Sequence, residues 1–233
     1  MSATTKIQWT DRTWNPVRGC SLVSAGCANC YAMKQAHRFS GMGRPYENLT
    51  EVGPKGPRWN GNIMLVPEAL DEPLRWKTPA RVFVNSMSDL FHEDVPDSFI
   101  DQVMRAMANT KRHVYQVLTK RPERMLDYLS GWWKRCYQDS ETGEYIPVNP
   151  CQHIWFGVSV ESQETADERI PLLLQAPAAV RFVSIEPLIG SVDIRRYLGN
   201  GNHSSGRVCV SGSSERGSGN SIGWNNLASE KEG

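Results

Sequence analysis

Three features are missing from the sequence, and each absence narrows the class of protein. Its 233 residues contain no apolar run near the ~20 residues that a helix needs to cross a bilayer. The first residues are polar and mixed, without the apolar stretch of a secretory signal. Neither sign of charge is in excess, because the sequence contains 26 Lys and Arg and 25 Asp and Glu. We therefore expect no overall positive electrostatic field that would attract nucleic acid. We therefore expect a cytoplasmic protein without a membrane span.

Short apolar runs alternate with amphipathic segments after residue 80. The runs are rich in β-branched residues and nearly continuous in apolar character, which is typical of buried parallel strands. The segments between them place apolar residues at helical spacing. Alternation of this kind predicts an α/β fold with a parallel sheet. The predicted strands are 81–86, 113–119, 154–160, 180–185 and, more weakly, 208–210, and the predicted helices are 96–110, 122–133 and 165–175.

Three parts of the chain do not follow this alternation. The N-terminal third is rich in Trp, Gly and Pro and is predicted to be irregular outside one helix. Residues 131–152 form a long polar segment, predicted as a loop inserted before a strand. Residues 199–223 are dominated by Gly, Ser and Asn, which predicts a poorly packed segment.

Three of the six cysteines lie within eleven residues, at Cys20, Cys27 and Cys30. In a reducing compartment, clustered cysteines are more often metal ligands than disulfides. Gly19 and Gly26 precede two of them and allow the backbone to wrap closely around a cluster. Three thiolates on a four-iron cluster leave one iron open for another ligand. The spacing therefore predicts an iron–sulfur cluster.

A zinc site is one alternative interpretation of the same cysteines, and three buried thiols without a metal are another. Structural zinc needs four ligands, so His37, His92 or a distant cysteine would have to supply the fourth. Cys136, Cys151 and Cys209 are isolated in the sequence and are interpreted as packed or incidental thiols.

The cysteine motif and several other blocks resemble the phage Gp thirty-seven/sixty-eight family, a group of radical-SAM-like proteins from phages and prophages. The similarity runs in order from residue 7 to about residue 194. The blocks that carry it are 7–16, 19–20, 26–32, 86–96, 118–125, 157–161 and 184–188.

The resemblance implies a partial (β/α) barrel of the radical-SAM type over residues 1–198, with the cysteine loop at 19–32. It implies a [4Fe-4S] cluster on the three cysteines and S-adenosylmethionine on the open iron, whose reductive cleavage gives a 5′-deoxyadenosyl radical. Two features depart from the common radical-SAM pattern. The first two cysteines are separated by six residues in place of three, and Asn29 stands where an aromatic residue is usual. The C-terminal segment, 199–233, conforms poorly to the family, so the last βα unit is interpreted as degenerate.

Polar residues follow the predicted strands, at the edge of a parallel barrel where functional groups gather. We expect them to face one rim, near the cysteine loop. No residue is assigned as catalytic. The predicted cofactor-binding residues are Ser88, Asp89, Lys120, Arg121, Ser159, Glu161 and Glu186.

Two roles are expected for these rim residues. Asp89 or Glu161 would accept hydrogen bonds from ribose hydroxyls or an α-amino group, and Lys120 or Arg121 would hold a carboxylate or phosphate. Solvated charges at a helix start are the alternative for the two cations, because Pro122 follows them. For Asp89 the alternative is an ordinary loop carboxylate, and for Glu186 it is a structural bond to the backbone.

Three functions compete at this point. The first is a radical-SAM-type enzyme that modifies a nucleic acid, a nucleotide or a protein, together with a companion known as the three-Cys-motif partner protein. The second is a non-catalytic zinc or nucleic-acid-binding module, and the third is a degenerate, inactive paralogue. The basic face that a nucleic-acid-binding module requires would come from Arg12, Arg18, Lys34, Arg38 and Arg44.

Overall fold

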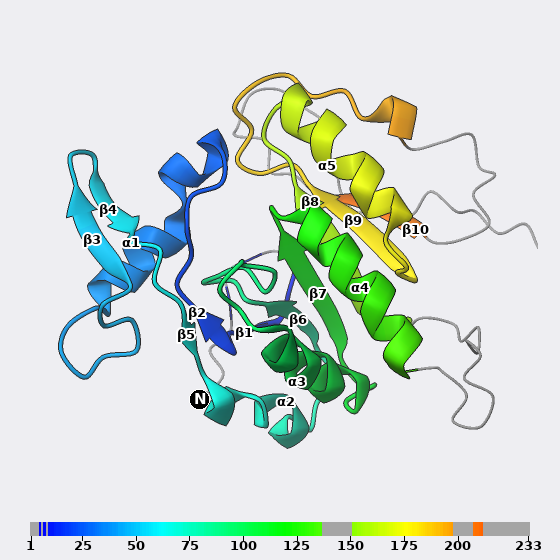
Figure 1. Ribbon diagram of the computed structural model, residues 1–233, viewed down its shortest axis with the longest axis horizontal. Coiled ribbons are helices and arrows are strands. Elements are labelled where there is room, and N and C mark those ends of the chain that lie inside the picture. The colour runs from blue at the N-terminus through cyan, green and yellow to red at the C-terminus, as the bar shows by residue number, and fades with distance from the viewer. Residues whose placement is uncertain (1–4, 6, 8, 137–150, 198–206, 212–233) are drawn as a thin grey trace, which may run out of the picture.

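A six-stranded parallel sheet organises the computed structural model, which describes residues 5, 7, 9–136, 151–197 and 207–211. The strand order is β1-β6-β7-β8-β9-β10, and every neighbouring pair is parallel (Figure 1). An open parallel sheet whose strands alternate with helices is a partial (β/α) barrel, so the predicted fold class is confirmed. The strands are β1 (Arg12–Trp14), β6 (Arg81–Val84), β7 (Val114–Thr119), β8 (Ile154–Ser159), β9 (Val180–Ser184) and β10 (Arg207–Ser211).

All five predicted strands are present, with small differences at their ends. β6 stops at Val84 because Asn85 takes a left-handed backbone conformation with φ of 59°. β1 was not predicted, because it is only three residues long and carries no periodic pattern. β1 is a strand because Trp14 and its neighbours pair with β6, so its conformation depends on a partner about 70 residues away.

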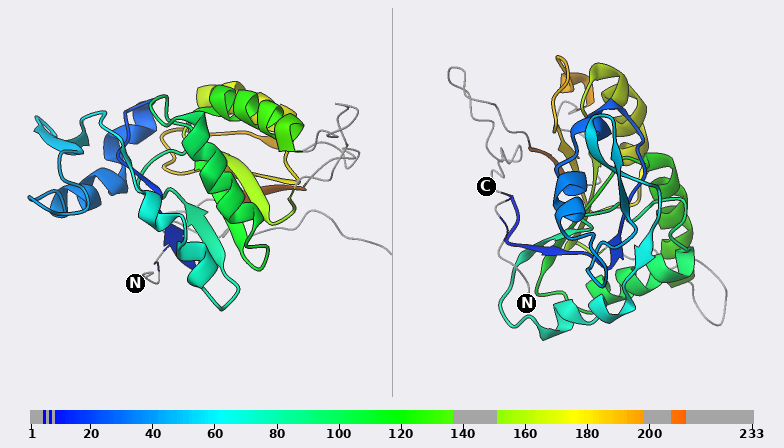
Figure 2. Two further views of the ribbon diagram at one scale, coloured as in Figure 1. Left: turned by 60° about the horizontal axis from the view of Figure 1, so that its bottom comes forward. Right: turned by 90° about the vertical axis from the view of Figure 1, so that its left-hand side faces the viewer.

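Three helices cover one face of the sheet (Figures 1 and 2). They are α3 (Asp97–Ala108), α4 (Pro122–Cys136) and α5 (Gln163–Gln175). A reciprocal capping box between Ser162 and Thr165 fixes the start of α5. α4 continues to Cys136, so the prediction of a loop from residue 131 is wrong at its start. The rest of that predicted loop, 137–150, lies outside the described residues.

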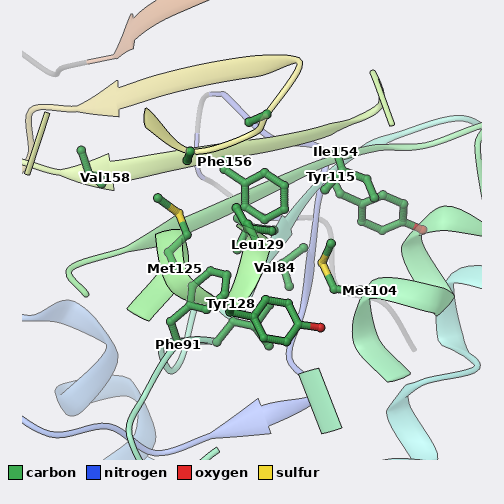
Figure 3. Packing of buried hydrophobic residues seen from close by; sticks show 14 of the residues in the cluster. Val84, Phe91, Met104, Tyr115, Met125, Tyr128, Leu129, Ile154, Phe156 and Val158 are labelled. Atoms are coloured by element: carbon green, nitrogen blue, oxygen red, sulfur yellow. The ribbon is translucent and has the colours of Figure 1, made fainter. Parts of the chain in front are cut away.

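The main hydrophobic core lies between this face of the sheet and the three helices. Alternate strand residues point into it, as the two-residue period of a strand requires. Tyr115, Phe156 and Val158 are fully buried there and meet Met104, Met125 and Leu129 of the helices (Figure 3). The opposite, inner face of the sheet carries Phe83, Leu118 and Phe182, and it faces the cavity described below.

The N-terminal third is more regular than predicted. Besides α1 (Tyr31–Arg38) it contains the short helix α2 (Glu72–Arg75) and two antiparallel ribbons. The ribbons pair β2 (Val17–Arg18) with β5 (Met64–Leu65), and β3 (Thr50–Gly53) with β4 (Gly56–Trp59). Residues 31–60, which comprise α1, β3 and β4, are called the N-terminal lobe below. The lobe extends beyond the edge of the main sheet (Figure 1).

The C-terminal region is described only over β10. This strand falls inside the segment predicted to be poorly packed, and it pairs with β9 at the edge of the sheet. Residues 198–206 and 212–233 lie outside the described residues, so the proposed domain boundary at residue 198 stays a prediction. Within the described part of the chain, no helix is long and apolar enough to cross a membrane.

Candidate functional site

One cavity of about 820 Å³ opens where the strands end and the cysteine loop crosses the rim. Its size is within the range of small-molecule sites, about 300–1,000 Å³. Cys20, Cys27 and Cys30 all line it. Six of the seven predicted cofactor-binding residues line it too, and Glu161 is the exception. Those six residues are Ser88, Asp89, Lys120, Arg121, Ser159 and Glu186.

The cysteine loop enters the rim beside the end of β6. Gly19 forms a parallel bridge with Ser88 and has φ of 90°, a conformation that favours glycine. A Cβ atom there would lie 2.2 Å from the carbonyl oxygen of Asn62. A short 3-10 turn, Ala25–Asn29, then leads from the second cysteine to the third. Gly19 is therefore required by close packing against the protein itself, before any cluster is considered.

Three thiols line one cavity, and three is the number of cysteine ligands that a four-iron cluster with one open iron requires. Among the residues that the structure describes, no group of three His, Cys, Asp or Glu side chains converges on one point that could hold an ion. Zinc requires four ligands around one centre. In a four-iron cluster the cysteines bind different iron atoms, so three thiols around one cavity suffice.

The surroundings of the Cys20 thiol disfavour its charged form. Burial, and then the negative charge of Asp89, raise the pKa of Cys20 to about 12, while Arg121 acts in the opposite direction. The thiol is therefore protonated at neutral pH in the metal-free protein, and a positively charged ligand must displace its proton.

Two serines between Cys20 and Cys27 anchor the loop to the barrel. The first is Ser21, next to Cys20. Its hydroxyl lies 2.8 Å from Nε2 of His92, accepts a bond of 2.7 Å from Arg121 and donates one of 3.2 Å to Glu93. Nδ1 of His92 accepts from the backbone of Asp94, so Nε2 carries the proton and donates to Ser21.

The second anchor joins Ser24 to Glu161. The Ser24 hydroxyl donates to Oε1 of this carboxylate. Oε2 accepts bonds from Lys120 at 3.0 Å and from Arg169 at 3.1 Å. Burial alone would raise the pKa of Glu161, but the bond from Ser24 and the charges of Lys120 and Arg169 lower it. Gly26 packs on the same carboxyl, and a Cβ atom there would lie 2.9 Å from it.

These contacts explain why Glu161 does not line the cavity. Its carboxylate is 1% exposed and faces the cysteine loop and α5. It was predicted as a possible ribose or amino-group ligand. In the structure both of its oxygens bind protein groups, so it holds the loop that carries the cysteines.

Asp89 and Arg121 are also bound by other protein groups. Asp89 accepts bonds from the hydroxyl of Thr119, the backbone of Lys120 and the guanidinium of Arg121. Arg121 donates from its three guanidinium nitrogens to Asp89, Glu93 and Ser21. Both residues line the cavity, but their hydrogen bonds hold the protein structure around Cys20.

The remaining polar groups of the cavity are better placed to bind a ligand. Lys120 shares the single carboxylate of Glu161 with Arg169, which leaves one positive charge in excess at this edge. Glu186 lines the cavity, and its carboxylate makes no hydrogen bond to any other described residue. Asn85 is 2% exposed, and within the described ranges its amide nitrogen has no acceptor. An unpaired buried donor costs about 1–3 kcal/mol unless a ligand satisfies it.

The floor of the cavity is apolar and aromatic. Trp9, Phe83 and Leu118 line it, with the rings of Trp9 and Phe83 4.7 Å apart. The aromatic side chains Tyr31 and Trp59 of the N-terminal lobe also line the cavity. A planar organic group is thus accommodated beside the cysteines.

Sequence reasoning missed five residues of this site. Ser21 and Ser24 are spacer positions of the cysteine motif, and His92 was considered only as a zinc ligand. Arg169 lies within a predicted helix, and Asn85 was assigned to a strand. The sequence offers only one weak indication of their role, which is that each is a polar residue close in sequence to a predicted rim residue or cysteine.

Comparisons with known proteins place the chain in a family. No curated protein matches it. Its fold is similar to a spore photoproduct lyase variant with bound AdoMet and dinucleoside spore photoproduct, with a TM-score of 0.48 and 14% identity. A second similar structure is spore photoproduct lyase complexed with dinucleoside spore photoproduct, with a TM-score of 0.46 and 14% identity. Each match covers 80% of this chain and 48% of the lyase, so the chain spans about half the length of those structures. The family described as "Protein of unknown function (DUF5131)" matches residues 4–222, and the chain therefore belongs to that family.

Proposed function

We propose that this chain is a radical-SAM-type iron–sulfur enzyme. Cys20, Cys27 and Cys30 would hold a [4Fe-4S] cluster, and the adjoining cavity would hold S-adenosylmethionine, as the resemblance to the phage Gp thirty-seven/sixty-eight family implies. One observation carries the proposal: the three cysteines and six independently predicted rim residues line the same cavity.

Three polar groups of the cavity, at Lys120, Glu186 and Asn85, match the polar groups of S-adenosylmethionine. The surplus positive charge at Lys120 suits the carboxylate of the methionine part. The carboxylate of Glu186 suits the α-amino group. The buried amide of Asn85 offers a donor to a ribose or base oxygen or nitrogen. Of the two cations predicted for this role, Lys120 is favoured. Its ammonium donates to Ser159 and Glu161 and has a third hydrogen to donate, whereas all three guanidinium nitrogens of Arg121 are bound to protein groups.

The chain's own residues would position and protect the reacting groups. When bound, the cluster and S-adenosylmethionine would supply a 5′-deoxyadenosyl radical that abstracts hydrogen from a substrate. The anchors at Ser21 and Ser24 hold the first and fourth residues of the long first spacer of the cysteine motif. Trp9, Phe83 and Leu118 would exclude water from the apolar floor.

Metal and sulfide analysis of protein purified without oxygen tests the cluster. We expect iron and sulfide near four of each per chain and their loss in the Cys27→Ala, Cys30→Ala double variant. Cys151→Ala is the matched control, because this cysteine does not line the cavity. One zinc per chain without sulfide would support a non-catalytic zinc module instead, and a metal content that survives the double substitution would show that the site is wrongly assigned.

Binding of S-adenosylmethionine is tested on the iron-loaded protein by its absorption spectrum and by calorimetry. Lys120→Met should weaken binding by about tenfold, which corresponds to one charge-assisted hydrogen bond. Lys111→Met removes an exposed cation just before β7, near the opposite ends of the strands, and should leave binding unchanged. Equal affinities for both variants and the parent chain would refute the role of Lys120.

The proposal extends to the substrate and to a partner. The modified substrate is a nucleic acid, a nucleotide or a protein side chain, and the three-Cys-motif partner protein is the proposed companion. Co-purification with that companion, followed by activity assays of the pair, would test this part.

A further inference from the structure

The N-terminal lobe is basic in a protein that is nearly neutral. Residues 31–60 contain five Lys and Arg against two Asp and Glu. Both acidic residues have partners inside the lobe: Glu47 accepts from the backbone of Gly43, and Glu51 pairs with Arg58. The other four cations are Lys34, Arg38, Arg44 and Lys55, and none forms an ion pair with another described residue.

Two of these cations share one face of α1 with an aromatic residue. The opposite face of the helix, with Ala32, Met33 and Ala36, is buried against the ribbon of β3 and β4. Tyr31, Lys34 and Arg38 follow the three- and four-residue spacing that places side chains on one side of a helix. All three are exposed to solvent.

This face of α1 begins at the mouth of the cavity. Tyr31 is 54% exposed, lines the cavity and donates from its hydroxyl to the backbone of Ser86. Lys34 and Arg38 continue away from the cavity along the helix. A backbone hydrogen bond from Tyr46 to Phe39 folds the following loop, with the exposed Arg44, back to the end of the helix. The result is a stripe of cations that starts at an aromatic side chain on the cavity rim.

We propose that this stripe binds the phosphate backbone of a single-stranded nucleic acid, and that one of its bases enters the cavity. Cations interleaved with exposed aromatic rings are the usual surface for single strands, because the charges follow the backbone and the rings stack on bases. A single strand is favoured because its base can reach the cavity without the unpairing and unstacking that extrusion of a base from a duplex requires. The entry of the base rests on the proposed function, but the binding of the backbone does not.

Two other basic residues near the cysteine loop do not take part. The guanidinium of Arg12 lies over the ring of Trp76, at 5.2 Å from its centroid. Arg18 lies over the ring of Tyr46 and donates to the carbonyl oxygen of Pro45. The basic face expected from the sequence is therefore reduced to Lys34, Arg38 and Arg44.

Fluorescence anisotropy of short labelled single strands, titrated with the full metal-free chain at several salt concentrations, tests the stripe. Each lost phosphate contact lowers the slope of log affinity against log salt by about 0.7 for a single strand. The Lys34→Glu, Arg38→Glu, Arg44→Glu variant should therefore bind at least about tenfold more weakly and lose about 2 from that slope. DNA and RNA strands are compared side by side to identify the natural sugar.

A charge-matched control separates the stripe from net charge. Arg75, Lys77 and Lys111 are exposed near the opposite ends of the strands, and their triple replacement by Glu makes the same change in charge. We expect the control to retain most of the parent affinity, with circular dichroism showing that both variants are folded. Equal losses in the two variants, or no binding of the parent chain at low salt, would overturn the proposal.

Two further measurements sharpen the test. Tyr31→Ala should weaken single-strand binding by about tenfold through lost stacking, without a change in salt slope, while Tyr31→Phe should retain it. Binding to vesicles of anionic lipid in place of oligonucleotides would refute the nucleic acid and point to a membrane surface. Because these assays use metal-free protein, absence of a cluster would not affect them.

Discussion

The outer face of the sheet and its C-terminal rim are both buried, but by different kinds of residue. The outer face buries Tyr115, Phe156 and Val158 against the helices. The rim buries charged groups, among them Glu161 and Arg169, each 1% exposed. Apolar burial stabilises a fold in proportion to area, whereas buried ion pairs roughly offset their own desolvation. The comparison indicates that the outer face sets the stability of the fold, and that the rim is built to position the cysteine loop.

The largest effect on stability should come from the outer face. Phe156→Ala removes a fully buried ring that contacts Phe91, and should lower the free energy of unfolding by about 3–5 kcal/mol. Chemical denaturation measures this loss. The fraction that stays folded should still bind iron in the parent stoichiometry, because Phe156 does not line the cavity. A loss of iron in the folded fraction would show that the outer face also determines metal binding, which would contradict the comparison.

Glu161→Ala should affect both properties, because it removes the anchor of Ser24 and leaves Arg169 buried without its partner. We expect about 3 kcal/mol of destabilisation in denaturation experiments and a lower iron content. Glu161→Gln keeps the shape and an acceptor for Ser24, so its iron content should lie between those of the Ala variant and the parent. Parent-like iron content in the Ala variant would show that this anchor is not needed.

Ser24→Ala tests the anchor of the cysteine loop separately, because it leaves the buried charges of Glu161 and Arg169 in place. Loss of one hydrogen bond should cost only about 1 kcal/mol, whereas iron loading after anaerobic reconstitution should fall clearly. Ser40→Ala is a suitable control, since that hydroxyl bonds only to the carbonyl oxygen of His37 in the lobe. Equal iron loading of the Ser24→Ala and Ser40→Ala variants would contradict the inference that the rim positions the cysteine loop.

The smallest effect should be a dependence of stability on pH. Burial lowers the pKa of His92, with Arg121 as a further cause, and burial also lowers the pKa of His113. The unfolded chain therefore binds more protons below about pH 6.5, so the free energy of unfolding should decrease as the pH falls through that value. Each histidine contributes at most about 1.4 kcal/mol per pH unit. Denaturation of His92→Gln and His113→Gln at neutral and mildly acidic pH should give flatter profiles than the parent, and identical profiles would contradict their lowered pKa values.

Much of the fold could be predicted because its strands and helices carry local periodic patterns. The strands β6 to β10 were expected within two residues of their ends, and Asn85 shows why β6 stops early. The short strand β1 could not be predicted, because its three residues carry no pattern and depend on β6.

The site was predictable in its location but less so in its roles. The rule that polar groups gather at the ends of parallel strands located Lys120, Ser159 and Glu186 correctly at one cavity. The same rule could not distinguish Glu186, whose carboxylate makes no hydrogen bond to another described residue, from Asp89, Ser159 and Glu161, whose side-chain oxygens are bound by other protein groups. Their ligand-binding roles stay predictions.

By itself, the sequence determined the alternation of strands and helices and the grouping of three cysteines in one loop. Both depend on neighbours along the chain, whose periodicity and spacing are visible in one dimension. Only the tertiary structure decided that Ser24 meets Glu161, 137 residues away, and that Ser21 meets Arg121, 100 residues away. Hydrogen bonds over such separations are set by how the barrel brings its strand ends together, and no local pattern in the sequence records them.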